Sequence, residues 1–270
     1  MKTNKIFTLL TCFALVITSI SCKKNDEVKP DEKNNITLEF DNQVGSDEMT
    51  LGTGSYKNSS GEDFTITTFN YFISNVSFKK SDGTVVKFPN DYFLIKQSDS
   101  ESFEATLKDL PVGDYTEVSF TVGVDSARSV SELSQRTGVL DPASYGTDNM
   151  YWAWNSGYIF FKFEGTSSVV PSDAAGKRVF QYHVGGFGGM TTKTINNLRT
   201  VTLPLPTSAT VRSNIAPEIH LFVDAAKVFN GTSTLNLATT FMVHSIGAAV
   251  PIADNYKTMF SVNHVHNDVQ

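Results

Sequence analysis

Residues 69–88 read FNYFISNVSFKKSDGTVVKF in one-letter code and carry the clearest signal for the fold. A period of two in the apolar residues predicts a β-strand with one buried face. Asp82-Gly83 supplies the positive φ that a tight hairpin turn requires, and residues 85–88 return as a second strand. Phe69, Tyr71 and Ile73 alternate along the first strand, which leads to Val76 and Phe78.

The same alternation recurs through the rest of the chain, separated by Gly, Pro and Asp turn signals. Helix signals are few: one turn over residues 131–135, and a short helix with Pro251 in its first turn. We therefore predict a mainly β protein, an antiparallel β-sandwich with a few short helices. Further strands are expected at residues 36–40, 103–107, 118–124, 158–164, 178–184, 201–205, 219–223 and 240–244.

Composition indicates a folded chain with no affinity for polyanions. The 270 residues are 40% apolar and 11% aromatic, and the formal net charge is −6. Such a chain can bury a core, and it lacks the basic surplus that nucleic-acid binding requires. Cys12 and Cys22 are the two cysteines. The remainder has no thiol, so any metal would be bound by the five histidines or by carboxylates.

The N-terminus is typical of a secretory signal. Lys2 and Lys5 precede an uncharged run over residues 6–21, which is shorter than the about 20 residues that span a bilayer. Ser19-Ile20-Ser21 before Cys22 resembles a bacterial lipobox, which implies cleavage there and lipidation of the Cys22 thiol. An ordinary signal cleaved nearby is the alternative.

The first residues after Cys22 are too polar to fold alone. We therefore expect a lipoprotein signal peptide at residues 1–21, a flexible tether at 22–35 and one β-sandwich domain at 36–270. The lipid would attach the protein to a membrane of the cell envelope. An outer-membrane lipoprotein, periplasmic or surface-exposed, is the expected localisation.

Common catalytic signatures are missing from the sequence. It contains no Gly-x-Ser-x-Gly elbow, no phosphate-binding loop and no His-Glu-x-x-His. We therefore expect a protein that is not an enzyme.

The histidines all follow residue 180. His264 and His266 would share one face of a strand, a spacing that suits a two-histidine arm for copper or zinc. A solvated tail is the alternative, because the chain ends shortly afterwards. His183 and His244 each close an apolar strand, where a single histidine is more often structural. His220 alternates with two aliphatic residues and faces away from them.

Both tryptophans lie in one segment, and Trp152 and Trp154 share a face if that segment is extended. Core packing is one explanation. A sugar-binding platform and a redox role beside bound copper are the others.

Several of these segments, in order, resemble the MbnP-like family of secreted or lipid-anchored proteins, which are common in Bacteroidetes. The resemblance spans about residues 36–266. The motifs that carry it are Tyr71-Phe72-Ile73-Ser74-Asn75-Val76, Asp82-Gly83, Leu110-Pro111-Val112-Gly113-Asp114-Tyr115, Val122-Gly123-Val124-Asp125, Met150-Tyr151-Trp152-Ala153-Trp154, Gly157-Tyr158, Phe163-Glu164-Gly165, His183-Val184-Gly185, Asp254-Asn255-Tyr256 and Met259-Phe260.

The resemblance implies a copper-binding protein of the periplasm or outer membrane. It also implies a tryptophan oxidised to kynurenine by a partner di-haem enzyme of the MauG/cytochrome c peroxidase type. Trp154, or else Trp152, matches the modified residue. The copper ligands implied for this sequence are His183, His244, His264 and His266.

One departure from the family concerns the first strand. The resemblance implies a histidine after it, whereas Phe40-Asp41-Asn42 has none. This leaves two other functions open, an adhesion or carbohydrate-binding module and a structural lipoprotein without a ligand. Convergence of the histidines near the tryptophans would favour copper, and exposed coplanar indoles would favour sugar.

Overall fold

The stretch that predicts the hairpin forms two strands of the larger sheet. The computed structural model describes residues 32–152, 154 and 157–269, and in it β4 (Asp63–Lys80) turns into β5 (Val85–Lys96). Gly83 has a φ of 88°, and the amide of Lys80 donates to the carbonyl of Thr84 at 2.8 Å. The predicted hairpin is confirmed, with strands longer than the alternation indicated.

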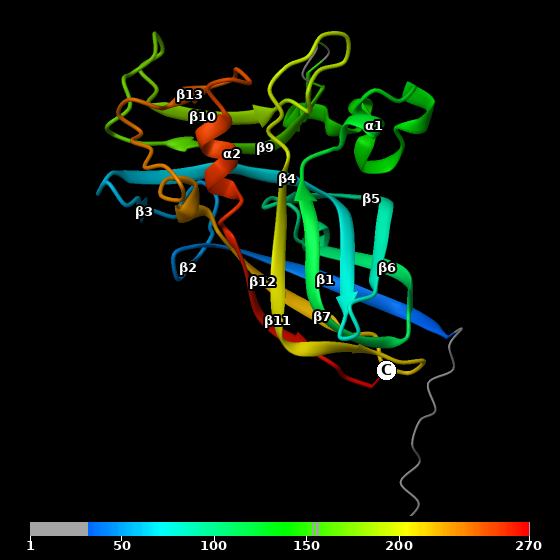
Figure 1. Cartoon of the computed structure of the whole chain (residues 1–270). Helices are drawn as coiled ribbons and strands as arrows, with labels where there is room; N and C mark the ends of the chain where they lie inside the picture. Colours follow the sequence, from blue (N-terminus) through cyan, green and yellow to red (C-terminus); the bar gives the residue numbers. More distant parts are fainter. Residues whose placement is uncertain (1–31, 153, 155–156, 270) are drawn as a thin grey trace, which may run out of the picture.

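Two sheets face each other in the molecule (Figure 1). The nine-stranded sheet has the order β11-β7-β4-β9-β10-β13, with β3 and β5 paired to β4 and β8 paired to β9. The five-stranded sheet has the order β14-β12-β1-β2, with β6 paired to β1. Most pairs are antiparallel, but β1 pairs with β12 and β10 pairs with β13 in parallel. The mainly β sandwich with few short helices is confirmed, and its sheets are mixed.

The remaining strands of the nine-stranded sheet are β3 (Tyr56–Lys57), β7 (Gly113–Val122), β8 (Tyr151–Trp152), β9 (Gly157–Thr166), β10 (Val179–Gly185), β11 (Arg199–Val211) and β13 (Met242–Val243). Those of the five-stranded sheet are β1 (Lys33–Val44), β2 (Asp47–Glu48), β6 (Glu104–Pro111), β12 (Glu218–Asp224) and β14 (Phe260–His266). The helices are η1 (Ser100–Phe103), α1 (Ser126–Ser129), η2 (Leu133–Gln135), η3 (Gly138–Leu140), η4 (Pro142–Asp148), η5 (Ala225–Val228) and α2 (Val250–Tyr256).

Aromatic rings from both sheets meet in the main core. The Phe40 ring of β1 makes edge contacts with Tyr71 of β4, Phe120 of β7 and Phe260 of β14, with centroids 6.0–6.4 Å apart. All four side chains are at most 5% exposed. Their edge-to-face geometry holds the two sheets together.

A second, smaller core lies on the other side of the nine-stranded sheet. Phe72 of β4 and Phe160 of β9 alternate away from the main core and pack with Tyr145 and Met150 of the segment that holds η4. The helical segment between β7 and β8 therefore covers part of the outer face of this sheet. The uncovered part of that face carries polar side chains.

The expected boundaries differ from the structure at two places. β1 begins at Lys33, so the last residues of the expected tether belong to the domain, because Lys33 pairs with Pro111 and Asn34 with Leu110 of β6. The strand expected at 240–244 shortens to Met242–Val243. The expected signal peptide and Cys22 lie outside the described residues.

The helix expected at Pro251 is present as α2, with the proline in its first turn. Among the described residues, the structure has no helix with the length and apolar character needed to cross a membrane.

Candidate metal centre

The five histidines fall into two clusters, one on each sheet. Each cluster lies on the outer face, because the neighbours of its histidines along the strands point into the core. The first cluster contains His183 and His244. The second contains His220, His264 and His266. The four predicted ligands therefore divide between two places, and one ion could not be shared by all four.

The first cluster is assembled by the parallel pair of β10 and β13. Gln181 pairs with Met242 and Tyr182 pairs with Val243, so the next residues, His183 and His244, come side by side. Their rings stack with centroids 4.4 Å apart and planes at 19°. His244 is exposed, whereas His183 has 15% of its side chain exposed.

A carboxylate fixes the orientation of His183. Its Nε2 lies 2.6 Å from Glu164 Oε1 of β9, and a carboxylate can only accept, so Nε2 carries the proton. Burial raises the pKa of the Glu164 carboxyl, but the hydrogen bond from His183 and the charge of Lys162 bring it below its usual value. Nδ1 of His183 is thereby left as the ring nitrogen that can bind a metal.

His244 stays uncharged more readily than a free histidine. Partial burial and the neighbouring His183 lower the pKa of His244 below its usual value, and Lys162 adds to this while Glu164 opposes it. A neutral imidazole is the form that ligates metals.

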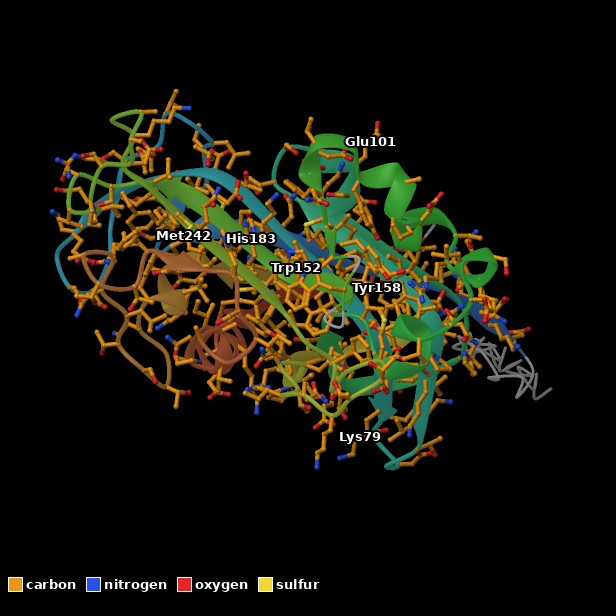
Figure 2. All side chains as sticks on the ribbon, turned by 90° about the horizontal axis from the view of Figure 1, so that it is seen from above. Lys79, Glu101, Trp152, Tyr158, His183 and Met242 are labelled. Atoms are coloured by element: carbon orange, nitrogen blue, oxygen red, sulfur yellow. The ribbon has the colours of Figure 1, made fainter. Side chains whose placement is uncertain are left out.

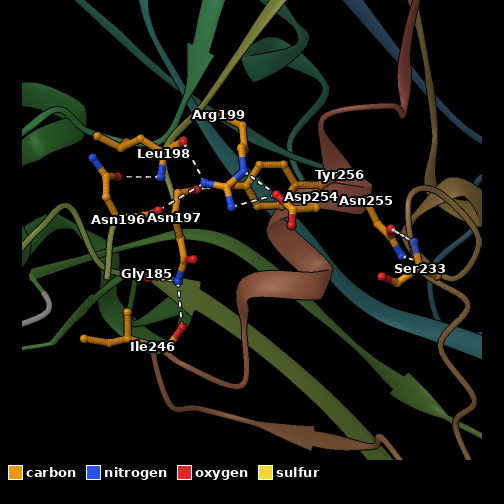
Figure 3. A network of polar contacts seen from close by, with 10 residues as sticks. All are labelled: Gly185, Asn196, Asn197, Leu198, Arg199, Ser233, Ile246, Asp254, Asn255 and Tyr256. Carbon is orange, nitrogen blue, oxygen red and sulfur yellow. Dashed lines mark hydrogen bonds and ion pairs between the residues drawn. The ribbon is translucent and has the colours of Figure 1, made fainter. Parts of the chain in front are cut away.

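The two strand ends that carry these histidines are joined by one buried side chain (Figure 3). Asn197 Nδ2 donates to the carbonyl of Gly185 at 2.8 Å and to that of Ile246 at 2.9 Å. The hydroxyl of Tyr256 in α2 donates in turn to the Asn197 carbonyl. Gly185 lies two residues after His183 and Ile246 two after His244, so Asn197 holds the pair in place.

The tryptophans lie at the same end of β10. A Cβ on Gly185 would come within 2.8 Å of Trp152 Cζ3, so the indole of Trp152 lies directly on that glycine. Gly185 and His183 are two residues apart on one strand, which separates them by about 7 Å. Figure 2 shows Trp152 and His183 along the same face of the sheet. The two tryptophans therefore lie near the first cluster and not near the second.

Trp154 stacks on Trp152, with centroids 5.0 Å apart and planes at 27°. Trp154 is 50% exposed, while Trp152 is only partly exposed. The rings lie one on the other and not side by side, so they do not form the two-ring platform expected of a sugar-binding site.

The second cluster includes His220, which is not among the ligands expected from the sequence. In the antiparallel pair of β12 and β14, His220 lies opposite His264, and Glu218 lies opposite His266. The rings of His220 and His264 stack at 4.3 Å, and His264 Nε2 is 2.8 Å from His266 Nε2. The alternation of β12 indicates the direction of His220, but no local pattern in the sequence indicates that β12 pairs with β14.

Two carboxylates from neighbouring strand positions face His220. Its Nδ1 lies 2.6 Å from Glu39 Oε2 of β1, and its Nε2 lies 3.8 Å from Glu218 Oε2. One ligand atom from each of His220, His264 and His266 fits within 4.8 Å of the others, and the same holds for Glu39, Glu218 and His220. The cluster combines imidazole and carboxylate donors.

Asn42 ends the stretch Phe40-Asp41-Asn42, which has no histidine where the family resemblance leads one to expect one. It is 3% exposed, accepts from the Tyr71 hydroxyl at 2.9 Å and donates to Gln97 at 2.9 Å. It belongs to β1 in the five-stranded sheet, apart from His183 and His244 in the other sheet. The first cluster therefore does not depend on a histidine at that position.

The chain is similar in sequence and in fold to proteins of one family. The model of the MbnP family matches residues 33–249. Among solved structures, MbnP from Methylosinus trichosporium is similar in fold, with a TM-score of 0.55 and 13% identity over 86% of this chain and 98% of that chain. No curated protein matches. Because the family model covers most of the chain, the resemblance seen in the sequence is confirmed, and the chain belongs to the MbnP family.

Proposed function

We propose that this protein is a lipid-anchored, extracytoplasmic copper-binding protein of the MbnP type, and that it is not an enzyme. The observation that carries the proposal is the placement of His183 beside His244, next to the tryptophan pair, in a chain of this family. Cys22 would carry the lipid. The protein would then lie at the outer membrane, in the periplasm or on the cell surface.

The donors of the first cluster suit copper. Imidazole nitrogen is a preferred ligand of Cu²⁺, which binds nitrogen sites more tightly than the other first-row dications. Glu164 orients the His183 ring, as carboxylates commonly orient metal-binding histidines. Because the rings are stacked, the exposed His244 would turn about its side-chain bonds to share an ion with His183.

A third donor would come from an oxidised tryptophan. Conversion of tryptophan to kynurenine oxidatively cleaves the C2–C3 bond of the indole, releases C2 as formate and frees an aromatic amine, so that the residue loses one carbon and gains one oxygen. A partner di-haem enzyme of the MauG/cytochrome c peroxidase type would supply the oxidising equivalents. Trp154 is the preferred residue, because its half-exposed ring is accessible to a partner. Trp152 is the other, since it lies nearer to β10.

The test is metal analysis with intact and peptide mass measurement on protein purified from its native host. We expect copper in stoichiometric amount and a peptide containing Trp152 and Trp154 whose mass has lost one carbon and gained one oxygen. Protein that is free of copper, unmodified and unable to take up added copper would contradict the proposal.

Matched variants locate the site. His183→Ala should remove the copper bound at the first cluster, and Glu164→Gln should weaken that binding by about 10–100-fold because it removes the orienting carboxylate. Glu101→Gln, at an exposed glutamate of η1, is the control for charge and should retain copper. If His183→Ala retained the native amount of copper, the ligand assignment would be wrong.

A further inference from the structure

We propose a second metal site, on the outer face of the five-stranded sheet, in which His220, His264 and His266 bind one divalent cation that prefers imidazole, Zn²⁺ or Cu²⁺. Glu39 orients His220, and Glu218 is the fourth ligand. The site is separate from the proposed copper site and does not depend on it.

Strand pairing places the ligands at adjacent positions. His220 faces His264 and Glu218 faces His266 across β12 and β14, and Glu39 of β1 faces His220 from the other side. Directly opposed residues on antiparallel strands have Cβ atoms about 5 Å apart. The site therefore rests on three rigid strands and not on a loop.

His220 is prepared to bind through Nε2. Its Nδ1 is occupied by Glu39 Oε2 at 2.6 Å, the arrangement in which a carboxylate fixes the tautomer and orientation of a metal-binding histidine. Its Nε2 is buried and has no hydrogen-bond partner within the described part of the chain. A buried nitrogen without a partner is unfavourable, and a cation at the centre of the cluster would satisfy it.

The distances between the donor atoms lie on either side of the distance expected between two ligand atoms of a tetrahedral metal ion. Metal–nitrogen bonds of about 2.0–2.1 Å imply neighbouring ligand atoms about 3.4 Å apart. His264 Nε2 and His266 Nε2 are 2.8 Å apart, and His220 Nε2 and Glu218 Oε2 are 3.8 Å apart. Small changes in side-chain torsions would bring all four atoms to one ion. Carboxylates facing the cluster also favour a cation.

The end of the chain that carries two of the ligands is anchored. Asn267 Oδ1 accepts from the amide of Thr210 at 2.7 Å, and its Nδ2 donates to the carbonyl of Ser208 at 3.0 Å. Val269 forms a further bridge with Ile215. These contacts to β11 and to the segment after it hold His264 and His266 in register, so the solvated-tail alternative does not describe this segment.

The experiment is a calorimetric titration of the purified full chain with ZnCl₂, together with NMR of the imidazole nitrogens. We expect one equivalent of Zn²⁺ to bind and to shift the nitrogen resonances of His220, His264 and His266. Glu39→Gln should weaken binding by about 10–100-fold, as loss of an orienting carboxylate does. Loss of a ligand in His220→Ala should weaken it further. A CuSO₄ titration of the same variants shows whether Cu²⁺ occupies the same ligands.

Two variants distinguish loss of this site from unfolding of the protein and from loss of the copper site. His266→Ala removes a ligand and should abolish Zn²⁺ binding at this site. Because the His266 side chain is 48% exposed, the substitution should leave the unfolding transition unchanged. His183→Ala should leave Zn²⁺ binding at this site unchanged. Wild-type protein that binds no Zn²⁺, or a His220→Ala variant that binds it as tightly as wild type, would overturn the proposal, whatever the outcome for copper.

Discussion

His183 and His244 stack with ring centroids 4.4 Å apart, although β11, β12 and η5 lie between them in the chain. The contact exists because β13 joins the edge of the sheet parallel to β10. Asn197 then links the backbone that follows each histidine. A pair of ligands is thus positioned by backbone pairing and by one buried amide.

Asn197→Ala removes both hydrogen bonds between the two strand ends. Because the carbonyls of Gly185 and Ile246 lose their donor, we expect the free energy of unfolding to fall by about 1–3 kcal/mol and copper retention to weaken. Urea unfolding and metal analysis measure the two effects. Asn90→Ala, at an exposed position, is the control. Equal stability of the two variants would rule out the bridging role.

Gly185→Ala would force a methyl group against Trp152. The new Cβ would lie 2.7 Å from the Tyr158 carbonyl oxygen and 2.8 Å from Trp152 Cζ3. Overpacking of this kind costs about 1–3 kcal/mol, and displacement of the indole should change its fluorescence. Gly247→Ala, where the nearest atom is 3.7 Å away, should change stability by less than about 0.5 kcal/mol. Unchanged fluorescence in Gly185→Ala would contradict the contact.

Phe40→Ala opens a cavity between the two sheets. Phe40 is fully buried and contacts three other aromatic rings, so we expect a loss of about 3–5 kcal/mol in the free energy of unfolding. Leu133→Ala removes a side chain that is 67% exposed and should lie within about 0.5 kcal/mol of wild type. Chemical denaturation checks both, and a small loss for Phe40→Ala would mean that this ring does not hold the sheets together.

Asp125→Asn should show a stability difference that depends on pH. Burial raises the pKa of the Asp125 carboxyl, but hydrogen bonds from Tyr92, the Arg128 amide and Asn75 bring it below its usual value. The folded state therefore holds a proton less tightly than the unfolded state. The stabilisation is complete above the unfolded pKa of about 3.9 and is lost as pH falls through the lower folded pKa.

At pH 7 we expect Asp125→Asn to be less stable by about 1 kcal/mol, because a neutral amide accepts weaker hydrogen bonds from Tyr92, Asn75 and the Arg128 amide than the carboxylate does. The difference should shrink in acid well below pH 4. Urea unfolding at several pH values measures it, with Asp47→Asn on the exposed strand β2 as the control. A difference that is the same at pH 7 and in acid would contradict the assigned pKa direction.

The local patterns of the sequence account for much of the fold. Alternation in residues 69–78 and the Asp82-Gly83 turn correctly predicted β4 and its hairpin, because both depend on neighbouring residues. Pro251 correctly predicted the start of α2. The strand expected at 240–244 was too long. Its apolar residues are compatible with a strand, but only Met242 and Val243 pair with β10.

The sequence alone indicates that His264 and His266 share one face of a strand and that His220 points away from Ile219 and Leu221, because side chains alternate along a strand. It also determined the family, through ordered short motifs. Which histidines come into contact depends on the folded arrangement, since the choice of a neighbouring strand depends on contacts between distant residues. That choice brought His220 to His264, joined His183 to His244 and divided one expected ligand set between two sheets.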